Sequence, residues 1–308
     1  MADSELDDVR RRLAGAATVN TYRLGSLVAR MMPGPLTPGA AASIGLGASF
    51  SNPTRRRMVE RHLLRVNPKM RGNALRVAVQ QAFDYYARYY LESFRLPTMS
   101  KVAVARPFTI DGWQLVLDGL AQGNGVILAL PHLGGWEWAG RWMTDQGFKM
   151  TVVVEALHPP ELFEWFADLR QELGMTVVPT GPKAGPAVLK ALRANEAVCL
   201  LCDRDLDRSG VEVEFFGERT TLPAGPATLS IRTGAPILPV GCYFTERYNG
   251  HHALVRPPVS THRFGGLRDD VARVTQELAR ELEFLIRRAP EQWHLFQPNW
   301  PSDPGYGD

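Results

Sequence analysis

The sequence has little cysteine, no strong excess of charge of either sign and no long uncharged apolar run. Its three cysteines in 308 residues are an odd number, which argues against a disulfide framework and favours a reducing compartment. The net charge of +3 is too small to indicate a nucleic-acid-binding protein. The apolar N-terminal segment is interrupted by Asn20, Thr21 and Arg23, so it predicts neither a transmembrane helix nor a signal peptide. A content of 45% hydrophobic and 22% charged residues is typical of a globular protein with a substantial core.

Two of the cysteines, Cys199 and Cys202, form a C-x-x-C spacing inside the apolar run AVCLLC. Side chains three positions apart in a strand point to opposite faces of the sheet. The two thiols could then not cooperate. We predict that they fill the core and serve neither redox nor metal chemistry.

The stretch VILALPHLGGWEWAG at residues 126–140 combines a strand, a glycine turn and a helix. Its opening apolar run predicts a buried strand, Pro131 ends that strand, and Gly134 and Gly135 form the turn. His132 is therefore expected just past the carboxyl end of a strand, where open α/β sheets place their ligands. Glu137 falls in the first helical turn, where the helix dipole favours a negative charge.

His132 and Glu137 form the spacing His-x-x-x-x-acid, which is weak evidence by itself. With seven histidines and acids at about one position in ten, about 0.7 matches arise by chance. What discriminates this match is its place between a strand and a helix. The alternative is a loop histidine bonded to nearby backbone and an acid that only favours the start of the helix.

Beyond this unit, apolar strands alternate with amphipathic helices. Strands are predicted at MTVVVEAL, MTVVPT and AVCLLCDRD, with helices at PPELFEWFADLRQELG and GPAVLKALRANE between them. This order predicts an α/β fold with a mainly parallel central sheet and helices on both faces. Further along, PILPVGCYF predicts a strand, HHALVRP an edge strand, and residues 267–288 a long amphipathic helix.

The first hundred residues predict a helical region. Helices are expected at residues 55–65 and 72–96, whereas residues 33–53 predict a Gly/Pro/Ala/Ser-rich connection with one short helix. Basic residues crowd this region, at residues 10–12, Arg23, Arg30, residues 55–57, Arg61 and Arg65. Basic residues beside apolar segments suit an anionic membrane surface. An amphipathic helix lying on a bilayer and a helix packing on the protein both fit.

Two further polar segments follow predicted strands. Asp203 and Arg204 come directly after AVCLLC, so we expect them at the same sheet edge as His132. The segment FFGERTTLPAGPATLSI predicts a loop that opens a helix, where free N–H groups and the nearby Arg219 could bind an anion. An ordinary solvated loop remains the alternative for both segments.

Three blocks of the sequence resemble a known family. HLGGWE, DRDLDRSGVEVEFFGERTTLPAGPATLSIRTGAPILPV and PEQWHLFQPNW are similar to bacterial lipid acyltransferases of the lipid A lauroyl/myristoyl type. The most similar branch is that of the phosphatidylinositol mannoside acyltransferases, which FRLPTM at residues 94–99 also resembles. The likeness covers nearly the whole chain. Two acids depart from the branch: Glu137 stands where it usually has Asp, and Asp203 where it usually has Glu.

The resemblance implies a glycerolipid acyltransferase-like fold and transfer of a long fatty acyl chain from acyl-CoA to a mannose hydroxyl of phosphatidylinositol mannoside. It implies a peripheral protein at the cytoplasmic face of the plasma membrane, with acyl-CoA as co-substrate and no metal or other cofactor. We divide the chain into a membrane-associating helical region, 1–100, and one continuous α/β acyltransferase core, 101–308. The alternatives are a lipid A precursor or another lipid as acceptor, a thioesterase, and a catalytically silent lipid-binding homologue.

The resemblance also implies roles for individual residues, and these roles suit the chemistry. His132 would take the proton of the sugar hydroxyl as it attacks the thioester, and backbone N–H groups of Gly134 and Gly135 would stabilise the oxyanion. A carboxylate that accepts a hydrogen bond from the other ring nitrogen would fix the tautomer of His132. Candidate substrate-binding residues are Arg170, which falls where the branch has a functional arginine, and also Arg204 and Arg219.

Asp203 is the carboxylate that we expect to orient His132. Five residues along a helix turn a side chain by roughly 140°. Contact between His132 and Glu137 would therefore require the glycine turn to fold back. Asp203 can approach from a neighbouring loop of the same sheet, and Glu137 is expected to act mainly on the turn through backbone N–H groups.

Overall fold

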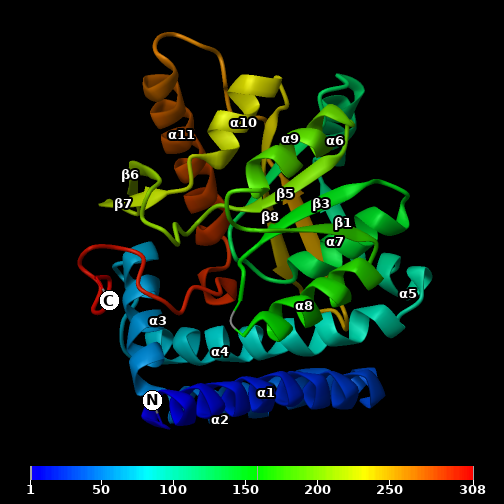
Figure 1. Cartoon of the computed structure of the whole chain (residues 1–308), viewed down its shortest axis with the longest axis vertical. Coiled ribbons are helices and arrows are strands. Elements are labelled where there is room, and N and C mark those ends of the chain that lie inside the picture. The colour runs from blue at the N-terminus through cyan, green and yellow to red at the C-terminus, as the bar shows by residue number, and fades with distance from the viewer. Residues whose placement is uncertain (1, 158, 308) are drawn as a thin grey trace.

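The structure is a computed structural model that describes residues 2–157 and 159–307. Within the first helix, burial is described for Gly15 and from residue 17 onward, so the basic side chains of residues 10–12 lie outside the described part. A seven-stranded sheet forms the centre of the molecule, and helices surround it (Figure 1).

The sheet has the strand order β1-β9-β8-β2-β5-β3-β4 and is mainly parallel, as predicted. From β8 to β4 all neighbouring strands are parallel, whereas β8 and β9 pair antiparallel. The strands are β1 (Phe108–Asp111), β2 (Val126–Leu130), β3 (Met150–Val154), β4 (Met175–Pro179), β5 (Ala197–Leu201), β8 (Ile237–Phe244) and β9 (His251–Val255). A separate antiparallel hairpin consists of β6 (Val211–Phe215) and β7 (Glu218–Leu222).

The prediction of an edge strand at HHALVRP is wrong, because β9 lies between β1 and β8. The alternation of buried and partly exposed residues along β9 is what a strand with one covered face shows. Whether a second strand flanks it depends on β1, which pairs with it in parallel from far away in the sequence. Local pattern carries no information on that pairing.

Helices cover both faces of the sheet, which confirms the predicted fold class. On one side α6 (Trp113–Ala121) and α7 (Trp136–Asp145) contact the strands, and on the other α9 (Ala184–Arg193), α10 (Gly225–Thr233) and α11 (Leu267–Arg287) do so. Cys202 belongs to the core cluster on one face of the sheet, and Cys199 packs against the cluster on the other face. The two thiols therefore lie on opposite faces and are free, as predicted.

Four long helices precede the sheet: α1 (Ala2–Met31), α2 (Thr37–Ser51), α3 (Pro53–Val66) and α4 (Gly72–Arg95). Helix α4 runs below the sheet in Figure 1, and α1 and α2 pack against its far side. Among the described residues no helix combines the length and the apolar character needed to cross a bilayer.

The sequence predicts only a short helix within residues 33–53, but helix α2 takes up 15 of these residues. Its buried residues are small and recur every fourth position: Thr37, Ala41, Gly45 and Ser49. A Cβ atom on Gly45 would collide with the backbone of Asp84 in α4, so the two helices approach very closely here. Tertiary packing overrides the poor helix propensity of glycine and proline.

The remaining elements connect these layers. They are the short helix α5 (Lys101–Ala105), helix α8 (Pro160–Glu172), and the 3-10 turns η1 (Gly34–Leu36), η2 (Leu96–Thr98) and η3 (Pro290–Gln292). After η3, residues 293–303 return to the carboxyl edge of the sheet, beside the loop that follows β2. This return brings a segment from the end of the sequence to the predicted site.

Candidate active site

His132 lies in the loop between β2 and α7, at the carboxyl edge of the sheet, as predicted. Gly134 in this loop has φ +59°, and a Cβ atom there would collide with the carbonyl group of Cys242. Only glycine fits this position without strain. The loop pairs with the segment after η3: the Gly134 N–H donates to the Gln292 carbonyl at 2.9 Å, and the His294 N–H donates to the His132 carbonyl at 2.7 Å.

Asp203 is in direct contact with His132. The Nδ1–H of His132 donates to one carboxylate oxygen of Asp203 at 2.7 Å, and its backbone N–H donates to the other at 3.0 Å. The two residues meet because β2 and β5 are neighbouring parallel strands with Leu130 opposite Leu201. Asp203 is fully buried, and its contact with Nδ1 leaves Nε2 of His132 as the basic nitrogen.

The surroundings of Asp203 favour its charged form. Burial opposes ionisation, but the charge and hydrogen bonds of His132 and a hydrogen bond from Trp293 outweigh it, so the pKa of Asp203 is lowered. A carboxylate that stays ionised can stabilise an imidazolium ion that forms during a reaction.

Glu137 does not act on the glycine turn, so that prediction is wrong. Its carboxylate accepts hydrogen bonds from the Arg170 guanidinium at 2.9 Å and from the Tyr89 hydroxyl at 3.1 Å. Burial would lower the pKa of Arg170, but the charge of Glu137 raises it. The first turn of α7 points this carboxylate toward α4 and α8, which contribute Tyr89 and Arg170.

The two glycines of the turn differ in what their N–H groups can do. The Gly134 N–H already donates to Gln292, so the prediction that it stabilises an oxyanion does not fit the structure. Gly135 is the N-cap residue of α7, next to the His251 ring. The first N–H groups of a helix have no acceptor within it, so the start of α7 is a place where an anion could find free donors.

The two other predicted arginines occupy different places. Arg204 lines the cavity beside His132 and pairs with Glu155 at 2.6 Å. Arg219 lies in the β6–β7 hairpin with its side chain 82% exposed, and pairs with Glu212. It does not line the described part of the cavity. The expectation of a substrate contact from Arg219 is therefore not met, because β7 carries its side chain toward solvent.

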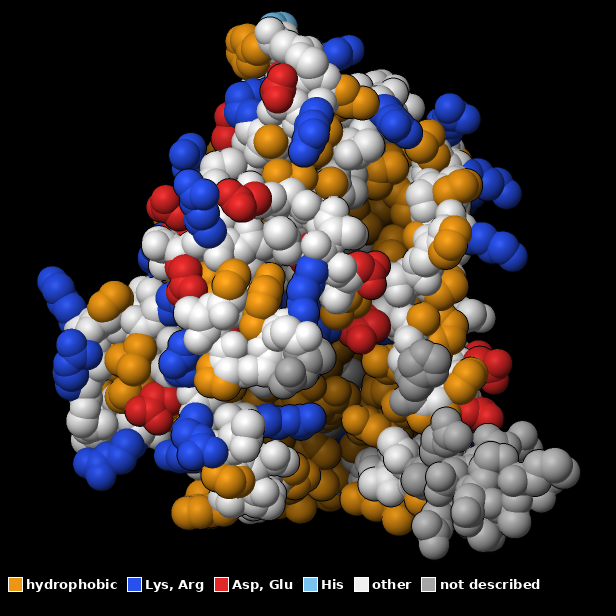
Figure 2. All heavy atoms as spheres, turned by 60° about the vertical axis from the view of Figure 1, so that its left-hand side comes forward, with side chains coloured by type: hydrophobic (Ala, Val, Ile, Leu, Met, Phe, Trp, Pro, Cys, Tyr) orange, Lys and Arg blue, Asp and Glu red, His pale blue; other side chains and the backbone are white. Residues whose placement is uncertain are grey.

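A cavity of ≈ 720 Å³ opens in front of His132. Figure 2 shows a hollowed face with hydrophobic side chains deep in the hollow. Aromatic residues from four helices line the cavity: Tyr22, Tyr86, Tyr89, Tyr90, Trp136 and Phe166. Arg170 and Arg204 add positive charge to this lining. The cavity can thus accept a ligand with both polar and flat apolar surfaces.

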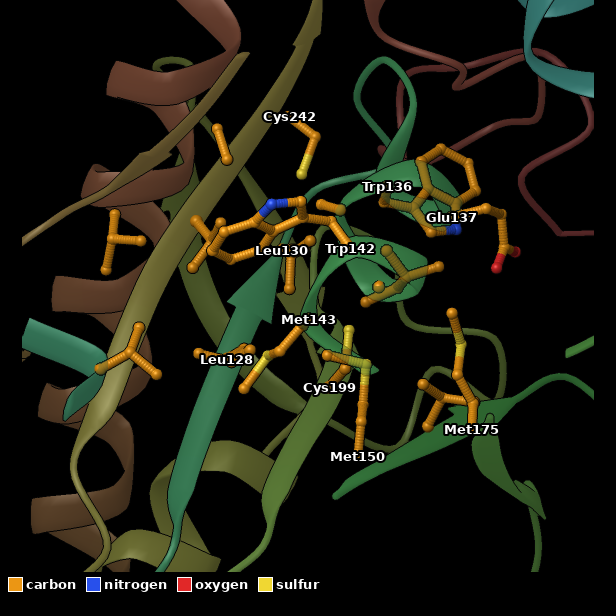
Figure 3. A pocket seen from close by; sticks show the side chains of 18 of the residues that line it. Leu128, Leu130, Trp136, Glu137, Trp142, Met143, Met150, Met175, Cys199 and Cys242 are labelled. Atoms are coloured by element: carbon orange, nitrogen blue, oxygen red, sulfur yellow. The ribbon is translucent and has the colours of Figure 1, made fainter. Parts of the chain in front are cut away.

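A second, narrow cavity lies between the sheet and α7, and its lining is almost entirely apolar (Figure 3). Its residues come from β1, β2, β3, β4, β5, β8 and β9, so it extends across the sheet. Trp136 and Arg170 line both cavities, and Glu137 lies at one side of the group in Figure 3. Burial raises the pKa of the Cys199 thiol in its lining to about 12, so this thiol is a wall of the cavity and not a nucleophile.

The sequence did not single out His294, Trp293 or Tyr89 as site residues. His294 Nε2–H donates to the Gly134 carbonyl at 3.1 Å, and burial lowers its pKa to about 3, so the ring is neutral. The block PEQWHLFQPNW carried family resemblance, but nothing in it showed that it returns to His132. Tyr89 lies in α4, for which the sequence predicted only a helix.

These features are those expected of a general-base site at the carboxyl edge of an α/β sheet: a histidine oriented by a buried carboxylate, with a cavity lined by aromatic side chains in front of it. Across the described residues, no group of three or more His, Cys, Asp or Glu side chains converges as a metal site would. Acyl transfer to a hydroxyl needs a base for the hydroxyl proton and a cavity that can hold the acyl chain.

The comparisons with known proteins agree with this class. The profile of the bacterial lipid A biosynthesis acyltransferase family matches residues 9–302, and the chain belongs to that family of acyltransferases. A phosphatidylinositol mannoside acyltransferase of Mycolicibacterium smegmatis is 36% identical over 298 residues, 94% of each chain. One of Mycobacterium tuberculosis (strain CDC 1551 / Oshkosh) is 41% identical over 227 residues, 72% of this chain and 70% of the relative. A lipid A biosynthesis acyltransferase of Haemophilus influenzae is 26% identical over 224 residues, 70% of this chain and 66% of the relative.

Proposed function

We propose that the protein transfers a long fatty acyl chain from acyl-CoA to a mannose hydroxyl of phosphatidylinositol mannoside, at the cytoplasmic face of the plasma membrane. The observation that carries the proposal is the contact of Asp203 with His132, which lines the larger cavity; this cavity shares Trp136 and Arg170 with the apolar one. The names of the mycobacterial relatives support the mannoside as acceptor. The proposal needs acyl-CoA as co-substrate and no further cofactor.

In the proposed reaction, Nε2 of His132 removes the proton of the mannose hydroxyl as its oxygen attacks the thioester carbonyl carbon. Asp203 stabilises the imidazolium, and N–H groups at the start of α7 stabilise the tetrahedral oxyanion. When the intermediate collapses, the carbon–sulfur bond breaks and His132 returns the proton to the leaving thiolate. The products are the acylated glycolipid and free CoA thiol.

The acceptor is tested with the purified protein, labelled palmitoyl-CoA and a panel of lipid acceptors. Products are identified by mass. We expect acylated phosphatidylinositol mannoside in excess over acylated lipid A precursor, acylated lysophospholipid and free palmitate. A dominant free palmitate product would indicate a thioesterase, and preference for another acceptor would replace the mannoside in the proposal.

The apolar cavity is the proposed site of the acyl chain, because a hydrocarbon gains about 0.8 kcal/mol for each CH₂ group removed from water. Replacing Cys199, a small residue of its lining, by phenylalanine should block it. We expect kcat/KM for palmitoyl-CoA to fall about tenfold or more, as the displaced methylenes lose this gain. Activity with butyryl-CoA should be retained and is the internal control. Equal losses with both donors would place the chain elsewhere.

Large apolar side chains on α1 and α2 face away from the protein. Leu24, Leu27, Val28 and Met31 on α1, and Ile44, Leu46 and Phe50 on α2, are all about half exposed or more. In Figure 2 hydrophobic side chains appear along the lower edge of the molecule, where Figure 1 places these helices. The exposed Arg23, Arg55 and Arg57 lie nearby in the sequence. An apolar surface with basic residues beside it suits an anionic bilayer.

Membrane association is tested by flotation with vesicles that contain anionic phospholipid. The double substitution Met31→Ser and Phe50→Ser removes two of the most exposed apolar side chains, 76% and 79% exposed. We expect weaker binding by about tenfold for each residue. Phe264→Ser is the matched control, since Phe264 is also 76% exposed but lies in the loop before α11. Unchanged flotation of the double variant would place the membrane-binding surface elsewhere.

Point substitutions are preferable here to deletion of residues 1–32. Helix α1 packs on α4 and contributes buried residues, among them Val19 and Ala29. Removing it would expose part of the core on α4 and α8. A loss of binding could then reflect misfolding and not a lost membrane contact.

A further inference from the structure

We propose that Trp293 is a positioning residue that sets the proton affinity of the His132–Asp203 pair through its indole N–H. The inference rests on the proposed function for the role of that pair. Trp293 Nε1–H donates to Asp203 Oδ2 at 2.7 Å. This is the oxygen that also accepts the backbone N–H of His132. The other oxygen accepts the ring N–H of His132, so each carboxylate oxygen has a defined donor.

Trp293 contacts Asp203 from the protein core, and not from the cavity in which a substrate would bind. The side chain is 3% exposed and, within the described part of the chain, does not line either cavity. It packs against Phe215, Phe216 and Trp300. These contacts fix the indole plane, so the direction of the N–H bond toward Asp203 is determined by core packing.

The segment that carries Trp293 is itself anchored. Asn299 Nδ2–H donates to the Asp203 carbonyl at 3.0 Å. The Asp303 carboxylate accepts the Asn299 and Trp300 backbone N–H groups at 2.9 and 3.1 Å and pairs with Arg65 of α3 at 3.1 Å. The indole is therefore held in place at several points along residues 293–303, which limits its freedom to move away when Asp203 changes its charge.

The electrostatic consequence has a definite sign. A hydrogen bond donated to a carboxylate stabilises its negative charge and lowers its affinity for a proton. Without the indole donor, Asp203 would be more basic and would bind an imidazolium at His132 more tightly. His132 would then become neutral, and able to act as a base, only at higher pH. Other titratable groups around the pair are Cys202, Arg204 and His294, with Tyr89 and Arg170 across the cavity.

Trp293→Phe removes the donor and keeps an aromatic ring in the core. Trp300→Phe is the matched control, because it keeps an aromatic ring against Trp293 and removes a different indole donor, which bonds the Phe215 carbonyl at 3.0 Å and not Asp203. The readout is the titration of the His132 ring nitrogens, followed by ¹⁵N NMR on the full-length protein. We expect Trp293→Phe to shift the His132 midpoint upward by roughly 0.5–1 unit and Trp300→Phe to leave it unchanged.

The activity profile supplies a second readout. The acidic limb of kcat/KM should move upward with the His132 midpoint in Trp293→Phe and stay in place in Trp300→Phe. A merely structural role would lower activity in both variants without moving either midpoint. Coincident His132 titrations in the two variants would overturn the inference.

A measurement on the unmodified protein covers the case in which Trp293→Phe does not fold. The indole N–H resonance of Trp293 should shift with pH together with the His132 ring, whereas that of Trp300 should not. The proposal would be refuted if the indole N–H chemical shift of Trp293 stayed constant over the pH range in which the His132 ring titrates. Neither NMR titration requires acyl transfer. If the unmodified protein failed to acylate any lipid, the proposed function would be wrong, but the NMR titrations would still decide whether Trp293 positions Asp203.

Discussion

His132→Ala is expected to reduce acyl transfer by about 10²–10⁴-fold, the usual contribution of general acid–base catalysis, with the fold retained. The loop should keep its path because its hydrogen bonds to Asp203, His294 and Gln292 use backbone groups of residues 132 and 134. Initial rates with palmitoyl-CoA and phosphatidylinositol mannoside give the loss, and far-UV circular dichroism and thermal unfolding report on the fold.

His252→Ala is the control for His132→Ala. His252 also faces an aspartate, Asp111, at 3.6 Å, but on β9 and outside the cavity lining described above. Its removal should leave turnover within about twofold, as for most surface substitutions. Turnover like that of the unmodified protein in a folded His132→Ala variant would contradict the general-base mechanism.

Asp203→Asn should reduce turnover by as much as about 10⁴-fold, because it forces the wrong histidine tautomer. Two donors, the His132 backbone N–H and the Trp293 indole N–H, point at Oδ2. The amide oxygen must occupy that position, since an NH₂ group there would face two other donors. The amide nitrogen then faces Nδ1 of His132, which has to accept. The ring proton moves to Nε2, where it prevents His132 from acting as a base.

Glu137→Gln should affect stability more than turnover, whereas Asp203→Asn should affect mainly turnover. Turnover should fall far less than in Asp203→Asn, because Glu137 contacts Arg170 and Tyr89 and not His132. Stability should fall by about 1–3 kcal/mol, since the substitution leaves the Arg170 guanidinium, on a side chain only 15% exposed, without its counter-charge. Initial rates and denaturant unfolding of both variants measure these losses of turnover and of stability. A larger loss of turnover in Glu137→Gln would mean that Glu137 is the acid that matters to the reaction.

The sequence predicted the parts of the site that depend on neighbouring parallel strands. Strand, turn and helix signals placed His132 after β2, and the apolar run before Asp203 placed it after β5. Parallel strands bring their carboxyl ends to one edge, so the contact between these two residues follows from local patterns. The faces of Cys199 and Cys202 followed from strand geometry in the same way.

Contacts among three separate elements could not be predicted. Glu137 joins Arg170 of α8 and Tyr89 of α4, and no local signal tells a helix N-terminal acid which neighbours it will have. The helix α2 was underestimated for a related reason: its small residues disfavour an isolated helix but permit close packing on α4. Trp293 was missed because the return of residues 293–303 to Asp203 is a long-range event.

The pairing of the His132 loop with residues 292–294 has a consequence for the entropy of the reaction. Fixing a backbone residue costs about 1–2 kcal/mol of conformational entropy, and loops that carry functional residues often bear this cost only when a ligand binds. Here the N–H of His132, its carbonyl group and the N–H of Gly134 are all bonded to other groups of the chain. The entropic cost of ordering this loop is therefore met when the chain folds, and the proposed base is already in place when a substrate binds.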